Sequence, residues 1–155
     1  MSKKINYGKR FEEDFLKSTP AGVFKLRIKD DTLRFKNVNN PADVILFFRG
    51  KMFLLELKST KEKSLPYGNI QDNQLNGLYE SSRIEGIIAG LVINFRSVEE
   101  TYFLHIDKAL EYMQTTTRKS FSLDFIRQEG ILIECKKKRV RYNYNINNLI
   151  DYYIK

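Results

Sequence analysis

Three ionisable residues interrupt an otherwise apolar part of the chain: Asp43, Glu56 and Lys58. They fall in two predicted strands, 42–48 and 51–58, which an Arg-Gly dipeptide joins. Glu56 and Lys58 are two residues apart, so both side chains project from the same face of their strand. If the dipeptide forms a two-residue hairpin turn, Asp43 lies directly opposite Glu56, with Cβ atoms about 5 Å apart. The spacing therefore predicts a pair of carboxylates beside one lysine.

Two carboxylates this close repel each other unless a cation lies between them. Oxygen ligands without His or Cys select Mg²⁺ or Mn²⁺, which accept the phosphate oxygens of a substrate. Such an ion activates a phosphodiester and a bound water, and Lys58 could orient or deprotonate that water or stabilise charge on phosphorus. The alternative is that Glu56 and Lys58 form an ordinary solvent-facing ion pair. It stays open, although the apolar flanks favour a buried site, where charges are costly without a function.

Hydrophobic periodicity predicts the elements around these residues. Helices are expected at 3–17 (with Ser2 as the candidate N-cap), 69–82, 107–114, 122–128 and from about 146. Further strands are expected at 24–28, 87–95, 101–105, 131–135 and 140–144, with loops at 37–41 and 59–68. The strand at 24–28 alternates like a half-buried strand, whereas the central pair is apolar enough to be buried on both faces. The pattern predicts an α/β fold with a mixed central sheet flanked by helices.

Length and composition limit the class of protein. A chain of 155 residues suits one domain, 1–155, and nothing in it marks a boundary. A single cysteine, Cys135, and a single histidine, His105, exclude an internal disulfide, multi-cysteine zinc modules and His-cluster metal sites. The longest apolar run, 87–93, is far shorter than the ~20 residues that cross a bilayer, and no apolar leader follows Met1. We therefore expect a cytoplasmic protein with no membrane partner.

The charge predicts a polyanionic partner. Lys and Arg number 27 against 19 Asp and Glu, which gives a net charge of +8 and a pI of about 9.5. Nucleic acid is the commonest such partner, because clustered cations release its condensed counterions; the alternative is a merely soluble basic protein. The candidate DNA contacts are a run interleaved with tyrosines and two residues of the first helix: Lys136, Lys137, Lys138, Arg139 and Arg141, with Lys9 and Arg10.

Several segments together resemble a known family. The Pro-Ala-Asp at 41–43 and the Glu-Leu-Lys at 56–58 match the motif of PD-(D/E)xK nucleases, which by itself is moderately specific. The chain also resembles RecU-type Holliday junction resolvases in a larger set of positions: 8–15, 49–51, 56–63, Pro66, Gln74, 102–104, Asp107 and Lys108. The resemblance runs from about residue 8 to residue 112, and its part from 49 to 74 is specific.

The resemblance implies a restriction endonuclease-like fold and a homodimeric, Mg²⁺-dependent endonuclease that nicks opposed strands of a four-way DNA junction. Asp43 and Glu56 match the metal ligands, with the Leu57 carbonyl as a third ligand, and Lys58 matches the catalytic lysine. Glu12 matches an acidic position on the first helix that binds the metal or orients its water, and Glu13 is a rival one residue further on.

Other matched positions have less specific roles. Gln74 falls on a family glutamine that could contact the site or the DNA, and it could equally be an ordinary polar helix residue. Thr60, Lys61 and Lys63 match a basic loop beside the scissile phosphate, and Lys63 could equally belong to a solvated run of charges.

One departure from the family pattern keeps other functions open. Family members carry an extended stalk before the motif aspartate, whereas only a short stretch separates Glu12 from Asp43 here. Junction selectivity must then come from another element, such as 29–40, or be absent. The alternatives are a related nicking, flap-cutting or restriction-like nuclease and a non-catalytic DNA-binding protein. The acidic pair argues against the last, because a pure binder gains nothing from carboxylates that face phosphates.

Overall fold

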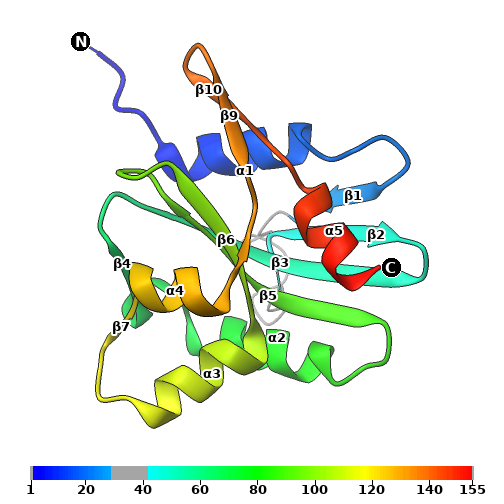
Figure 1. Cartoon of the computed structure of the whole chain (residues 1–155), viewed down its shortest axis with the longest axis vertical. Helices are drawn as coiled ribbons and strands as arrows, with labels where there is room; N and C mark the ends of the chain where they lie inside the picture. The colour runs from blue at the N-terminus through cyan, green and yellow to red at the C-terminus, as the bar shows by residue number, and fades with distance from the viewer. Residues whose placement is uncertain (1, 29–41, 155) are drawn as a thin grey trace, which may run out of the picture.

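A six-stranded mixed sheet forms the centre of the structure, a computed structural model that describes residues 2–28 and 42–154 (Figure 1). In spatial order its strands are β1 (Phe24–Arg27), β2 (Val44–Phe48), β3 (Lys51–Thr60), β5 (Ile87–Phe95), β6 (Glu100–His105) and β8 (Ile131–Leu132). β3 and β5 are parallel and the other neighbours antiparallel. Two small antiparallel pairs join β4 (Ser64–Pro66) to β7 (Ser120–Ser122) and β9 (Cys135–Lys138) to β10 (Arg141–Tyr144).

Helices cover both faces of this sheet, as the α/β prediction requires (Figure 1). They are α1 (Tyr7–Lys17), α2 (Asp72–Ser82), α3 (Ile106–Thr115), α4 (Leu123–Glu129) and α5 (Asn147–Tyr153), with a 3₁₀ turn, η1 (Tyr67–Asn69). α1 and α5 pack with one apolar cluster, and α2, α3 and α4 with the other. None of the helices in the described residues is long and apolar enough to cross a membrane.

The β2–β3 turn fixes which residues face each other. Arg49 and Gly50 have φ values of 46° and 77°, as the two central positions of a type I′ turn require. The ladder ends with Val44 opposite Leu55, so the predicted two-residue turn and its register are confirmed. Beyond that pair, within the part of the chain that the structure describes, 56–60 of β3 pair only with β5. This end of β3 therefore has one edge that β2 does not cover.

The two central strands differ in burial. All residues of 53–57 in β3 are buried, because the strand has neighbours on both edges and helices over both faces. In β2, Val44 and Leu46 are buried, whereas Phe47 is exposed. The prediction of burial on both faces is thus confirmed for β3 and wrong for β2, which lies next to the edge strand.

The edge strand β1 also corrects the sequence analysis. It is a strand, as predicted, but all four of its residues are exposed rather than half-buried. β1 pairs only with β2, so nothing in the described residues covers its outer edge. The predicted loop 37–41 and the segment 29–40, considered as a junction-recognition element, lie outside the described residues.

Several predicted boundaries are wrong for local reasons. α1 begins at Tyr7 rather than at residue 3, because Asn6, not Ser2, caps it by accepting a hydrogen bond from the Lys9 amide at 3.0 Å. α2 begins three residues after the predicted start. The predicted loop 59–68 contains the end of β3, the strand β4 and η1, and the predicted strand 131–135 is divided between β8 and β9. β5 occupies the predicted range, and β6, α3, α4, β10 and α5 begin within one residue of it.

Candidate active site

Asp43 lies just before β2, where the ladder with β3 ends. Its amide donates to the Leu55 carbonyl at 3.0 Å, so it leaves the regular register and is not the direct cross-strand partner of Glu56. Its side chain nevertheless reaches β3, because Oδ2 accepts a hydrogen bond from the Leu57 amide at 2.9 Å. The predicted direct opposition is therefore wrong in detail, while the proximity of the two acids is retained.

Glu56 is buried in the middle of this arrangement, with 2% of its surface exposed. Its Oε1 accepts a hydrogen bond from Gln74 Nε2 at 2.9 Å and lies 3.2 Å from the ammonium of Lys58. Burial, and then the negative charge of Asp43, raise the pKa of Glu56 to about 7, against the opposing effect of Lys58. The sequence predicted this acid and lysine together, and Gln74 brings α2 into the same site.

The carbonyl of Leu57 faces the same uncovered edge. In a strand the N–H and C=O of one residue point to the same side. Since the Leu57 amide donates to Asp43, the Leu57 carbonyl is directed towards that side as well. Two carboxylates and one carbonyl therefore border one end of β3. We refer to Asp43, Glu56, Lys58 and Gln74 as the acidic pocket.

Glu12 approaches the pocket from α1, on the opposite face of the sheet from α2. With Lys9, Arg27, Leu57 and Lys58 it lines a cleft of about 460 Å³. Burial and the charge of Asp43 raise the pKa of Glu12, and Arg27, whose guanidinium lies 2.8 Å from its carboxylate, opposes the rise.

Glu13, the rival of Glu12, lies elsewhere and pairs with Arg141 at 3.0 Å. Among the described residues, no three Asp, Glu, His or Cys side chains stand close enough to share one metal ion. Glu12 therefore does not stand in one cluster with Asp43 and Glu56 but pairs with Arg27, and its role at the metal or at a metal-bound water stays a prediction.

The donor set that does form fits a hard divalent cation. Asp43 is close enough to raise the pKa of Glu56, so the two acids repel each other when both are ionised, and a cation would relieve that repulsion. Two carboxylates and a carbonyl suit Mg²⁺ or Mn²⁺, because these ions keep several water ligands.

The residues predicted to contact DNA near the pocket differ in how exposed their side chains are. Lys61 and Lys63 are exposed, as is Lys9, and Arg10 is half-buried. Thr60, by contrast, is 7% exposed, and its hydroxyl accepts from the Glu62 amide and donates to the Ser64 carbonyl. The Thr60 hydroxyl thus closes the turn between β3 and β4, and its contact with DNA stays a prediction.

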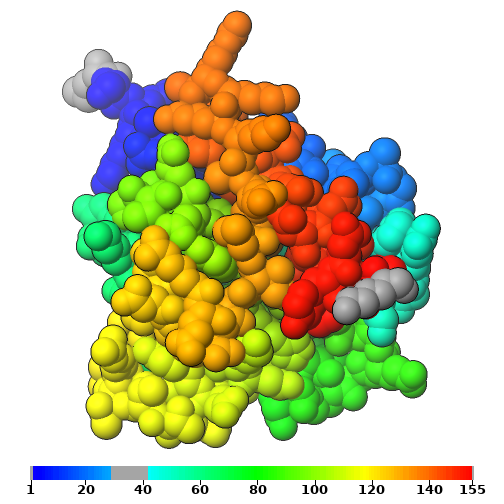
Figure 2. All heavy atoms as spheres, viewed as in Figure 1, coloured from blue at the N-terminus to red at the C-terminus, as the bar shows by residue number. Residues whose placement is uncertain are grey.

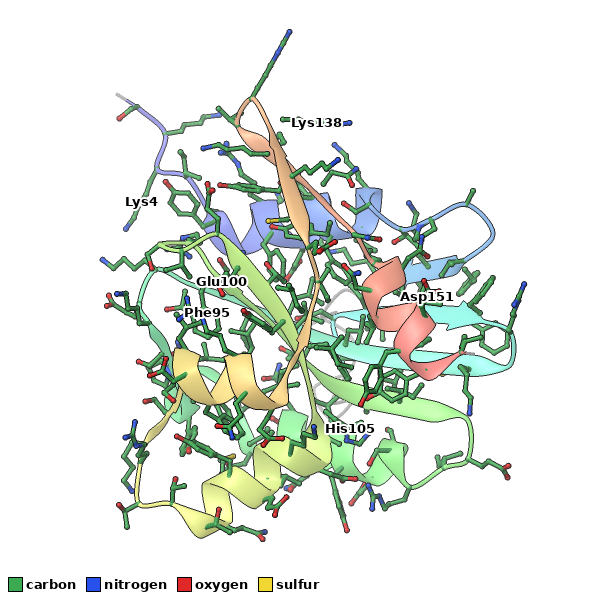
Figure 3. The ribbon with its side chains drawn as sticks, in the orientation of Figure 1. Lys4, Phe95, Glu100, His105, Lys138 and Asp151 are labelled. Atoms are coloured by element: carbon green, nitrogen blue, oxygen red, sulfur yellow. The ribbon has the colours of Figure 1, made fainter. Side chains whose placement is uncertain are left out.

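The β9–β10 pair, with its connecting turn, is a basic hairpin that extends beyond α1 (Figure 1). Its side chains project past the rest of the surface, and Lys138 points away from the body of the molecule (Figures 2 and 3). Lys136, Lys137, Lys138 and Arg139 are exposed. Arg141 is different: its guanidinium pairs with Asp14 at 2.7 Å and Glu13 at 3.0 Å. Arg141 thus anchors the hairpin to α1, and its contact with DNA stays a prediction.

Sequence reasoning missed the polar residues on the α1 side of β3. Ser59 donates a hydrogen bond to Asn94 at 2.9 Å, and Asn94 donates to the buried Thr101 at 3.0 Å. Arg96 donates to the Ser59 hydroxyl at 3.0 Å, and its guanidinium lies over the ring of Tyr7. The one available signal was Asn94, a polar residue inside the apolar run of β5.

Comparison with known proteins shows the family of this chain. The family model for "Recombination protein U" matches residues 23–148. A Bacillus subtilis (strain 168) protein described as "SPbeta prophage-derived uncharacterized protein YotM" is 32% identical, over 97% of this chain and 88% of its own length. A Staphylococcus epidermidis "Holliday junction resolvase RecU" is 31% identical, over 96% of this chain and 85% of its own length.

Among solved structures, the chain is similar to Hjc of Archaeoglobus fulgidus, described as a Holliday junction resolvase from an archaeal hyperthermophile. The TM-score is 0.56 at 20% sequence identity, and the match covers 79% of this chain and 93% of that one. At this identity the likeness establishes the fold, which is that of the predicted nuclease class.

Proposed function

This chain belongs to the RecU family, and we propose that it is a structure-specific endonuclease that resolves four-way DNA junctions. The observation that carries the proposal is the acidic pocket: a buried carboxylate, a second carboxylate and a lysine converge at the end of β3 that β2 leaves uncovered. Hydrolysis would leave a 5′-phosphate and a 3′-hydroxyl. The net charge of +8 supports a DNA substrate.

We assign the roles in the pocket from the contacts of each side chain. Asp43, Glu56 and the Leu57 carbonyl would hold Mg²⁺, with Mn²⁺ as a substitute. When bound, such an ion polarises the phosphodiester and lowers the pKa of a coordinated water. Lys58 would orient the attacking water or stabilise the charge that develops on the phosphoryl oxygens.

Two further residues hold these groups in place. Gln74 donates to Glu56 Oε1 while its own Oε1 accepts from the Gln71 amide at 3.1 Å, so the first turn of α2 orients the carboxylate. Glu12 would bind a water of the metal rather than the metal itself, because Arg27 already pairs with its carboxylate. Both residues are positioning residues in this proposal.

A homodimer would suit the substrate. A four-way junction has two opposed strands to cut, and a symmetric pair of subunits presents two equivalent sites to them. Selectivity for the junction would then come from the relative placement of two sites rather than from base contacts.

Cleavage of defined substrates tests the proposal. A synthetic four-way junction, a linear duplex, a flap and a single strand are incubated with the protein in Mg²⁺, with EDTA and Asp43→Asn as controls. We expect paired nicks in the junction only, abolished by both controls. Equal cutting of plain duplex would instead indicate a related nuclease without junction preference. Tight junction binding with no cleavage in Mg²⁺ or Mn²⁺ would indicate a non-catalytic DNA-binding protein.

A further inference from the structure

A second cleft lies on the other side of the first turn of α1 from the cleft of Glu12 and Lys58. It has a volume of about 620 Å³, and the basic hairpin forms its far wall. The residues that bear on its chemistry are Tyr7, Arg10, Lys61, Arg96, Lys137 and Tyr142. We call it the strand cleft. Its neighbour, the 460 Å³ cleft of Glu12 and Lys58, also contains Ser59, to which Arg96 donates, so one hydrogen bond links the two clefts.

Arg96 is held in place from three directions. Its amide donates to the Thr60 carbonyl at 2.9 Å, which fixes its backbone beside the end of β3. Its Nη1 donates to Ser59 Oγ at 3.0 Å, and its guanidinium lies 4.4 Å from the centre of the Tyr7 ring. Ser59 is in turn oriented by Asn94. The guanidinium is therefore positioned against the residue that follows Lys58 in β3.

The charges around the strand cleft favour an anion. None of the ion pairs formed within residues 2–28 and 42–154 uses Arg10, Lys61 or Arg96. The two acids that line the cleft already have partners: Asp14 pairs with Arg141 at 2.7 Å, and Glu99 accepts from the Tyr142 hydroxyl at 2.7 Å. The cleft thus has unpaired cations on its rim.

Aromatic walls between cations are the usual construction of a site for unpaired nucleotides, in which bases stack on rings and phosphates meet the cations. Tyr7, from the start of α1, is 45% exposed, and Tyr142, from the hairpin, lines the opposite wall. A junction strand with unpaired bases beside the cut would fit such a site. Each ring is held beside a cation, since Arg96 lies over Tyr7 and Lys137 over Tyr142, so a base that contacts a ring brings its phosphate close to a positive charge.

From this geometry we propose that the strand cleft holds the DNA strand where it continues from the scissile phosphate, and that Arg96 binds a neighbouring phosphate of that strand. This proposal rests on the proposed function, since it takes the acidic pocket as the place of cutting. Because Arg96 is hydrogen-bonded to Ser59, which lines the same cleft as Lys58, its phosphate contact sets the position of the strand relative to the lysine. Arg96 is a positioning residue and acts through the substrate.

The test removes one phosphate charge at a time. Junctions carrying a single neutral methylphosphonate at successive positions of one strand are bound by wild type and by Arg96→Ala in EDTA, where no cleavage occurs. Neutralising the phosphate that Arg96 binds should weaken wild-type binding about 10- to 100-fold and leave the binding of Arg96→Ala unchanged. Cleavage of the unmodified junction in Mg²⁺ by wild type locates that phosphate relative to the cut.

Arg49→Ala is the matched control. Arg49 also lies over an aromatic ring, that of Phe48 at 5.1 Å, but it is at the β2–β3 turn, the opposite end of these strands from Lys58. Arg49→Ala should therefore keep the wild-type dependence on each phosphate, because it retains Arg96. If Arg96→Ala fails to fold, judged by its circular dichroism, Arg96→Gln is used in the same scan.

Each outcome decides the proposal. The proposal is supported if the Arg96 variant no longer responds to neutralisation of one or two phosphates within a few nucleotides of the cut, while wild type does. Retention of the full wild-type dependence in the Arg96 variant overturns it, as does a dependence confined to positions far from the cut. The protein could also bind the junction with an Arg96-dependent response to a phosphate near the junction centre and yet never cleave it. In that case the strand cleft is a DNA-binding site and the proposed function fails.

Discussion

The acidic pocket and the basic hairpin both carry charge, but they hold it in opposite ways. In the pocket, Asp43, Glu56 and Lys58 are buried or half-buried, and each changes the ionisation or orientation of another. In the hairpin, Lys136 and Lys138 are exposed and make none of the ion pairs among the described residues. The effect of a buried charge depends on its distance from each partner, whereas exposed charges act mainly through how many of them lie together. The following predictions test this contrast.

The largest effect should come from the lysine of the pocket. Lys58→Met keeps the apolar stem and removes the ammonium, so we expect junction cleavage to fall by roughly 10²- to 10⁴-fold while DNA binding is little changed. Single-turnover cleavage and fluorescence anisotropy measure the two properties. Lys51→Met, at the other end of the same strand, is the control and should cut at nearly the wild-type rate. Equal cleavage rates for wild type and Lys58→Met would show that Lys58 has no role in cleavage.

A second effect follows from the titration of Glu56. Its pKa in the folded protein is raised to about 7, from an ordinary value of 4.5, so the folded state binds a proton that the unfolded state releases between these values. Stability from this proton is complete below pH 4.5 and is lost as the pH rises through about 7. In metal-free buffer, the free energy of unfolding of wild type should therefore fall, by on the order of 3 kcal/mol between pH 4.5 and pH 8, relative to Glu56→Gln. Parallel pH profiles from urea unfolding would contradict the burial of this charge.

Two substitutions of Gln74 distinguish its contact with the Glu56 carboxylate from its capping of α2. Gln74→Ala loses both the donor to Glu56 and the acceptor for the Gln71 amide. Gln74→Glu keeps an acceptor for that amide, but above the pKa of the pair it replaces the donor with a carboxylate that repels Glu56. If the contact with Glu56 matters, both variants should cleave about 10- to 100-fold more slowly, and only the alanine variant should lose stability through the cap. Normal cleavage by Gln74→Glu would reduce Gln74 to an ordinary polar helix residue.

The smallest effects should come from the tip of the hairpin. Lys138→Ala should weaken binding of every DNA substrate alike and reduce the slope of log K against log salt by about 1, with the cleavage rate at saturation unchanged. Arg141→Ala, at the base of the same hairpin, should instead lower stability by about 1–3 kcal/mol, because Asp14 is 3% exposed and loses its cationic partner, keeping only the Tyr142 amide. Salt titrations and thermal unfolding distinguish the two. An unstable Lys138→Ala would show that the tip is structural.

The same contrast explains how far sequence reasoning could go at the site. The turn at Arg49 and Gly50 was predictable because two-residue hairpins admit few geometries, and it placed Asp43 near Glu56. The shift of Asp43 out of the ladder was not predictable, because it depends on a hydrogen bond to the Leu57 amide. The contacts of Thr60 and Arg141 within the chain were unpredictable for one reason: composition identifies polar and basic side chains, but only the fold shows which partners their polar atoms have.

The amino-acid order by itself determined the class of fold, the hairpin that pairs the two central strands, and the residues able to hold a divalent ion. These follow from periodicity, turn chemistry and residue type, which are local properties of the chain. Only the tertiary structure decided that Glu12 pairs with Arg27, that Gln74 reaches Glu56, and that Arg96 lies beside the residue after Lys58. Those contacts join segments far apart in the chain, and their partners are chosen by how helices pack on the two faces of the sheet, which no local pattern encodes.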